Sequence, residues 1–171
     1  MNQKTVFNDL DPLMGFRFQV DFKEQMLKST DNSPVSVSSG SFSECSGLEA
    51  TVEPKVIKEG GRNWGEVQRM GSVIFSTVIL KRGMTTNKHL WNWFDYLGNQ
   101  GHYAQRMNVT ITMFNHSGEG IYSWKLTNAI PVKFKAADLN AQDGSQIAIE
   151  EIHLAHEGMT LEKPEIKDLK N

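Results

Sequence analysis

The chain has 171 residues with 18 basic and 20 acidic side chains, which give a formal net charge of −2 and an isoelectric point near 6.2. A nearly neutral chain has no broad field that attracts nucleic acid or anionic lipid, so sequence-independent binding to either is disfavoured. No apolar run approaches the roughly 20 residues of a membrane-spanning helix, and the first residues lack the pattern of a signal peptide. We therefore expect one soluble domain, residues 1–171, with a substantial core.

Two strands are predicted in the first third of the chain. Residues 16–22 alternate between apolar and polar side chains, as in a half-buried strand. A polar connection rich in Ser, Lys and Asp then occupies residues 23–40. Alternation resumes over residues 41–54, and we expect this strand to end at Pro54 because proline cannot donate to a strand ladder.

Residues 54–71 predict a protruding arm whose flanks pair as a hairpin, because polar residues and three glycines surround Trp64. An exposed tryptophan is unfavourable in water, and Trp and Arg are common anchors of protein interfaces. We therefore interpret the arm as a contact with another subunit rather than as an idle surface loop.

In the middle of the chain the spacing of apolar residues changes from that of a strand to that of a helix. Residues 72–80 predict a strand that is covered on both sides, because apolar side chains occupy both of its faces. Residues 87–97 then predict a helix of about three turns on the flank of the sheet. Thr86 or Asn87 is the expected N-cap and Gly98 the expected stop. We expect the aromatic side chains of this helix to belong to the core rather than to stack on bases or sugars.

Period two returns over residues 107–115, 120–135 and 146–159. The segment 120–135 has 16 residues and keeps one apolar parity almost throughout, whereas strands mostly have about 3–10 residues. In the last segment the apolar parity changes at residues 150–151, which predicts a β-bulge there. Residues 161–171 predict a charged, loosely held tail.

No motif predicts catalysis, a cofactor or a metal site. His153 and His156 are the best metal candidates, but residues three apart on a strand point to opposite faces, so we interpret both as solvated or hydrogen-bonded. Glu49 and Glu53 lie too far apart along a strand for a glycosidase pair, and we interpret them as exposed. Cys45 has no disulfide partner, and we interpret it as a buried apolar group in a reducing cytosol.

The order and spacing of four stretches carry a resemblance: DPLMGFRFQVDF, SFSECSGLEATVEP followed by IKEGG, ILKRGMTTNKHLWNWF, and AIPVKFKAADLNAQDGSQIAIEEIHLAHEGM. Together they span about Asp11 to Thr160 and resemble the tail-tube proteins of contractile-tailed phages and the inner-tube proteins of phage-like contractile injection systems. The resemblance implies a mainly β fold, an antiparallel β-barrel or sandwich with one flanking α-helix. It also implies a non-enzymatic subunit of which six copies close a ring, and of which stacked rings form a rigid hollow tube that sheath contraction drives through a target envelope.

The same resemblance implies which surfaces make contacts. In a ring, the long strands of each copy would pair with those of its neighbours and leave no free edge. The predicted subunit contacts, on the arm and in the DPLMG loop, are Val56, Ile57, Arg62, Trp64, Val67, Met70, Pro12 and Met14. A further contact is implied for the loop at residues 135–145. The predicted channel-facing residues are Asn108, Thr110, Thr112, Ser123, Lys125 and Thr127.

The implied partners are further copies of the chain, a sheath, a baseplate, a tube-initiating or capping protein, and cargo in the lumen, with genome passage only in a phage. The protein would be made in the cytoplasm and assembled into a phage tail or an extracellular injection particle. Two alternatives stay open: a monomeric ligand-binding β-barrel, or a small β-rich hydrolase or lectin that uses His153 and His156. A monomer with a closed apolar pocket would indicate the first, and a bound metal or a residue-specific loss of activity would indicate the second.

Overall fold

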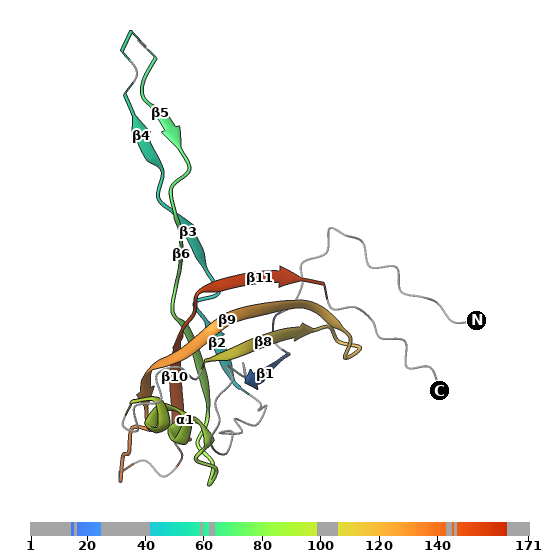
Figure 1. Ribbon diagram of the computed structural model, residues 1–171. Helices are drawn as coiled ribbons and strands as arrows, with labels where there is room; N and C mark the ends of the chain where they lie inside the picture. The colour runs from blue at the N-terminus through green and yellow to red at the C-terminus, as the bar shows by residue number, and fades with distance from the viewer. Residues whose placement is uncertain are drawn as a thin grey trace, which may run out of the picture.

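The computed structural model describes residues 15, 17–24, 42–58, 60, 61, 64–98, 106–142, 145 and 147–163 (Figure 1). Within these residues the fold has eleven strands and one helix. In chain order the elements are β1 (Phe18–Glu24), β2 (Glu44–Ser46), β3 (Ala50–Val52), β4 (Lys55–Ile57), β5 (Val67–Arg69), β6 (Val73–Phe75), β7 (Val78–Gly83), α1 (His89–Gly98), β8 (Met107–Phe114), β9 (Gly120–Lys135), β10 (Ile149–Ala155) and β11 (Gly158–Glu162). The predicted mainly β fold with one helix is therefore confirmed.

One antiparallel seven-stranded sheet forms the body, with the strand order β1-β8-β9-β10-β7-β2 and β11 paired to β9 beside this path. The long strand predicted over residues 120–135 is confirmed as β9, and all of its 16 residues are extended. Its first half pairs with β8 and β11, and its second half pairs with β10. We call the strands β1, β8, β9 and β11 sheet A, and the strands β9, β10, β7 and β2 sheet B. The two sheets share β9 and do not close into a barrel within the described residues.

The strand β9 passes from one sheet to the other at Asn128, whose φ of 54° lies in the left-handed region. Val109 pairs with Leu126, whereas Met107 pairs with Ala129, so β9 has one extra residue at this point. An extra residue bends a strand and shifts every later side chain to the opposite face. Leu126 and Ala129 are accordingly both buried, so the single apolar parity predicted for the whole segment breaks at Asn128. A second extra residue at Val132 restores it, and Phe134 again packs against the core.

Hydrogen bonds hold Asn128 in this conformation. Its backbone N–H donates to Asn108 Oδ1 at 3.2 Å, and its side-chain Nδ2 donates to Glu157 Oε2 at 2.5 Å. Arg106 forms an ion pair with the other carboxylate oxygen of Glu157. The pKa of Glu157 is lowered, first by the Asn128 hydrogen bond and then by the nearby Arg106 charge. The bend is therefore fixed from the start of β8 and from the β10–β11 turn.

The helix predicted over residues 87–97 is confirmed as α1, which packs on the core side of the sheets. It begins where predicted, because Asn87 Oδ1 accepts a hydrogen bond from the backbone N–H of His89 at 3.1 Å. Trp93 is fully buried and meets the Phe22 ring edge-on at 5.7 Å between centroids. No described helix has both the length and the apolar character needed to cross a membrane. The core residues are Val20, Phe42, Val78, Leu80, Leu90, Trp93, Leu97, Met107, Val109, Ile111, Leu126, Ala129, Ile152 and Leu154.

The prediction of one doubly covered strand over residues 72–80 is wrong. The segment divides at Ser76 into β6 and β7, and only β7 belongs to the body. Val73 and Ile74 of β6 are about half exposed, at 48% and 53%, because β6 leaves the body. The strand predicted over 41–54 divides in the same way into β2 and β3. The predicted end near Pro54 is confirmed, because β3 ends at Val52 and a separate strand, β4, begins after the proline.

The β-bulge predicted at residues 150–151 is also wrong, because β10 alternates regularly from Ile149 to Ala155. Glu150 points inward and pairs with Arg82, while Ile149 points outward and is 47% exposed. A register shift does occur opposite His153 and Leu154, but the extra residue is Val132 of β9, because His153 pairs with Lys133 and Leu154 pairs with Pro131. The predicted loose tail over residues 161–171 is wrong at its start, since residues 161 and 162 belong to β11, and residues 164–171 lie outside the described residues.

We expect substitutions at Asn128 to test the bend in β9. A β-branched residue is strongly disfavoured at positive φ, so Asn128→Val should lower the free energy of unfolding by about 2 kcal/mol. Asn128→Gly accepts the same backbone angle and should lower it less, because only the side-chain hydrogen bond is lost. Chemical denaturation monitored by tryptophan fluorescence would measure both. Equal losses for the two variants would contradict this account of the bend.

The buried ion pair between β7 and β10 gives a second prediction. Arg82 Nε donates to Glu150 Oε1 at 2.6 Å, and the two residues are only 7% and 4% exposed. Removing one partner leaves a buried charge, so Glu150→Ala should lower the free energy of unfolding by about 3–5 kcal/mol. The double variant Arg82→Met with Glu150→Leu should lose much less, because neither charge remains. A double variant as unstable as the single one, in urea denaturation, would contradict this reading.

Candidate assembly surfaces

The described residues of the segments 50–61 and 64–75 form a narrow two-stranded arm that projects from the body, as Figure 1 shows. The pair β3–β6 makes its base and the pair β4–β5 makes its outer part. The backbone N–H of Ser76 donates to the carbonyl of Glu49 at 3.1 Å where the arm meets the body. At Gly71 the two strands approach so closely that a Cβ would lie 2.0 Å from the carbonyl oxygen of Glu53. A glycine is therefore required for this close approach.

Apolar side chains on the arm face solvent. Trp64 is 94% exposed and Met70 is 80% exposed, and Val56 is half exposed. Ile57 and Val67 lie opposite each other across β4 and β5 and are partly buried. An arm with so many exposed apolar side chains has too few contacts within its own chain to bury them. Of the other predicted contact residues, Arg62, Pro12 and Met14 lie outside the described residues.

The predicted channel-facing residues lie together on one face of sheet A, opposite the core. Thr110 pairs with Lys125, and Thr112 pairs with Ser123. The hydroxyls of Thr112 and Ser123 are 3.1 Å apart, and Ser123 is buried within the single chain. Lys125 and Thr127 are exposed, and Asn108, Thr110 and Thr112 are partly buried.

The sequence analysis predicted the strand β1 but did not assign it, or β11, to this polar face. Gln19 and Asp21 of β1 pair with Thr112 and Thr110, so they extend the face on one side. On the other side Glu162 of β11 lies beside β9, and its carboxylate receives a hydrogen bond from Lys125 Nζ at 2.5 Å. The only sequence signal for β11 is a short alternation over residues 158–162 within a charged segment. Such a short pattern becomes a strand only because β9 is long enough to pair with it.

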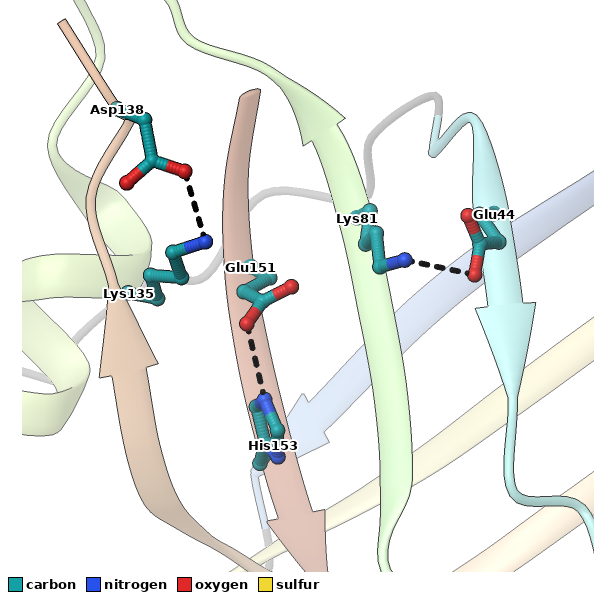
Figure 2. A network of polar contacts seen from close by, with 6 residues as sticks. All are labelled: Glu44, Lys81, Lys135, Asp138, Glu151 and His153. Atoms are coloured by element: carbon teal, nitrogen blue, oxygen red, sulfur yellow. Dashed lines mark hydrogen bonds and ion pairs between the residues drawn. The ribbon is translucent and has the colours of Figure 1, made fainter. Parts of the chain in front are cut away.

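The outer face of sheet B carries a row of charges, shown in Figure 2. Glu151 lies opposite Lys135 on β9 and opposite Lys81 on β7, and Lys81 lies opposite Glu44 on β2. Lys81 Nζ donates to Glu44 Oε1 at 2.9 Å, and Lys135 Nζ donates to Asp138 Oδ2 at 2.9 Å. Opposite charges on neighbouring strands stabilise a sheet. This face is therefore largely neutralised within one chain.

His153, His156 and Cys45 lie among the described residues, and each has an ordinary structural environment. His153 Nε2 lies 3.3 Å from Glu151 Oε1, and His156 Nδ1 lies 2.9 Å from the carbonyl of Gly158. The described residues contain no group of three or more His, Cys, Asp or Glu side chains placed to hold a metal ion. Burial raises the pKa of Cys45 to about 11, with a smaller contribution from the Glu44 charge, so its thiol stays protonated at neutral pH.

A family model described as T4-like virus tail tube protein gp19 matches residues 14–160. The match covers most of the chain, and the chain therefore belongs to the tail-tube protein family. The resemblance found in the sequence is confirmed. A search of curated protein sequences finds no match.

Solved structures with the same fold come from contractile injection systems. A chain of the anti-feeding prophage baseplate, 6-fold symmetrised, is 26% identical, with a TM-score of 0.74 over 90% of this chain and 97% of that chain. A chain of the PVC sheath–tube complex, from an extracellular contractile injection system in the extended state, is 20% identical, with a TM-score of 0.72 over 90% and 93%. A type six secretion system protein shares the fold at 13% identity, with a TM-score of 0.54 over 86% and 84%.

Family, fold and surface agree on the class of function. The chain is a structural subunit of the tail-tube type, and it is not an enzyme. Its function is to build a tube. The surfaces that stay open in the described part of the single chain are the arm, the polar face of sheet A and the outer edges of that sheet.

Proposed function

We propose that six copies of the chain close a ring through the free edges of sheet A, and that these rings stack into the hollow inner tube of a phage tail or a contractile injection particle. The observation that carries this proposal is the open state of sheet A. Its outermost strands β1 and β11 each pair on one side only in the described part of the chain. Unpaired strand edges attract further strands, and a closed ring removes them.

The strand directions of sheet A suit ring closure. Each of its neighbouring strands is antiparallel to the next, from β1 through β8 and β9 to β11. All copies in a ring share one direction along the axis. The β11 strand of one copy would therefore lie antiparallel to the β1 strand of the next, which continues the same ladder pattern across the boundary.

Apolar side chains at the two edges support the same contact. Met159 and Leu161 of β11 pair with Leu126 and Trp124 of β9 and so lie on its core side. Leu161 is 58% exposed because the sheet ends beside it. A neighbouring β1 strand would cover Leu161 and join the apolar layers of the two copies. Interfaces that resemble a divided core are typical of obligate assemblies.

The opposite face of sheet A would line the channel. Six copies of these four strands make a barrel of about 24 strands, which is wider than the 16–18 strands that leave an aqueous channel in porins. Amide and hydroxyl groups dominate the described face and suit a wet wall. Its described residues are Gln19, Asp21, Lys23, Asn108, Thr110, Thr112, Ser123, Lys125, Thr127, Thr160 and Glu162.

The arm would connect a copy to other copies in the stack. Its exposed Trp64 and Met70 are suitable anchors for such a contact. A sheath, a baseplate and a cap are proposed as further partners, because similar chains come from baseplate, sheath–tube and cap structures. Cargo would travel through the lumen. After assembly the protein would be located in the phage tail or the injection particle.

We expect Leu161→Asp to block ring closure, because a carboxylate would be buried at the proposed contact between β11 and β1. The monomer should stay folded, since Leu161 is exposed in the single chain. Sedimentation velocity and negative-stain images would show rings for the wild type and monomers for the variant. Ile147→Asp is a matched control, because Ile147 is 74% exposed and lies outside sheet A. Normal rings from Leu161→Asp, or a wild type that forms no ring at any concentration, would contradict the proposal.

We expect Trp64→Ala to weaken stacking of rings while leaving the chain folded. Truncating a buried aromatic anchor in an interface typically costs about 2 kcal/mol or more, whereas removing a 94% exposed side chain costs the monomer little. Tube length in electron micrographs and the thermal midpoint of the monomer would measure the two effects separately. Trp64→Phe should retain long tubes. Unchanged tube lengths for Trp64→Ala would show that the arm does not use this residue.

A further inference from the structure

The arm carries two positive charges at the same place. Lys55 on β4 lies directly opposite Arg69 on β5, and both are exposed. Like charges directly opposite each other destabilise a two-stranded ribbon. No described carboxylate forms an ion pair with either side chain, whereas Lys58 and Glu66, further along the same ribbon, form an ion pair at 3.7 Å. We call Lys55 and Arg69 the cationic pair.

The base of the same arm carries two carboxylates that lack a cation. Glu49 and Glu53 are both exposed. Glu49 Oε1 receives only a hydrogen bond from the Thr51 hydroxyl at 3.4 Å, and no described Lys or Arg forms an ion pair with Glu49 or Glu53. Strand geometry places Glu49 about 20 Å along the arm from Lys55, whereas Glu53 lies about 7 Å from it and forms no ion pair with it among the described residues. Glu49 therefore cannot reach the cationic pair of its own arm, and one arm cannot bring all four of these charges together.

We propose that the cationic pair of one copy binds the arm-base carboxylates Glu49 and Glu53 of a neighbouring copy. The partner is a second copy of this chain because it supplies two unpaired carboxylates for two unpaired cations. Ile57 and Val67 form the next cross-strand pair on the same face of the ribbon, and they would exclude water from one side of the contact and strengthen it. This inference rests on the proposed assembly and adds an ionic contact to it.

Ionic contacts between exposed charges weaken with salt, because the Debye length falls from about 10 Å at 0.1 M to about 3 Å at 1 M. Assembly of the wild type should therefore decrease between these two salt concentrations. The neutral variant Lys55→Gln with Arg69→Gln keeps side-chain length, removes the mutual repulsion, and should lose most of this salt dependence. Its folding is not in question, because both side chains are exposed and repel each other in the single chain.

Two charge-reversed variants give the sharper test. Variant one, Lys55→Glu with Arg69→Glu, has an acidic outer arm and an acidic base. Variant two, Glu49→Lys with Glu53→Lys, has a basic outer arm and a basic base. Each alone should form about tenfold less polymer than the wild type, because like charges meet at every contact. An equimolar mixture should assemble to within about twofold of the wild type, because alternating copies restore opposite charges at every contact.

A matched control keeps the size of the charge change. Lys88→Glu with Lys133→Glu alters two exposed lysines outside the arm and should assemble like the wild type. The ionic contact is refuted if each charge-reversed variant assembles normally alone, or if both are folded by circular dichroism and their mixture assembles no better than either. A wild type that builds tubes beside such a result would leave the proposed function intact. A wild type that forms neither rings nor tubes would refute both.

Discussion

The shared strand β9 is the constraint on which the rest of the structure depends. One continuous strand of 16 residues supplies the centre of both sheets, so the two sheets must change direction inside it. The left-handed conformation of Asn128 permits this change, and contacts to Asn108 and Glu157 hold it. Because the bend shifts the side-chain phase, β9 points apolar side chains toward the core in both halves. Sheet A and sheet B can therefore share one core although their strands run in different directions.

The body and the arm differ in the pairing of their charged side chains and in the burial of their apolar side chains. In the body, inward-facing charges are paired, as Arg82 and Glu150 are, and the apolar side chains of β7, β8 and β10 are buried. The arm exposes Trp64 and Met70 and leaves a cationic pair without a counter-ion. A chain with a packed body and an arm of exposed apolar side chains is stable as a folded unit and incomplete at one end. This division suits a protein that folds first and assembles afterwards.

Much of the fold could be predicted from local patterns. The alternation in β1, β8 and the first half of β9, and the helical spacing of Leu90 and Leu97, depend only on which neighbours along the chain are apolar. The features that were missed depend on distant residues. Glu150 points inward because Arg82, 68 positions earlier, provides its counter-ion. Asn128 adopts positive φ because hydrogen bonds to Asn108 and Glu157 stabilise this conformation. The presence of an asparagine inside an alternating segment does not by itself predict positive φ.

The candidate surfaces were predictable to a similar extent. Exposure of Trp64 follows from its polar and glycine-rich surroundings, and the polar parity of β8 follows from simple alternation. The break after β6 was hidden because Val73, Ile74 and Phe75 look like core residues. Only the path of the chain out of the body makes them part of an arm. The role of β11 was hidden because its partner, β9, lies some 30 residues earlier along the chain.

The even number of alternating strands in sheet A has a geometric consequence for subunit number. Every copy begins and ends its sheet with strands of opposite direction, so circles of five, six or seven copies would all satisfy the backbone equally well. The number of subunits must then depend on how far sheet A of one copy curves between β1 and β11. Sheet twist and curvature, rather than hydrogen-bond pattern, would set the bore of the tube. Changes in side-chain volume on β1 and β11 would thus alter the diameter of the tube and keep the backbone hydrogen bonds between neighbouring copies.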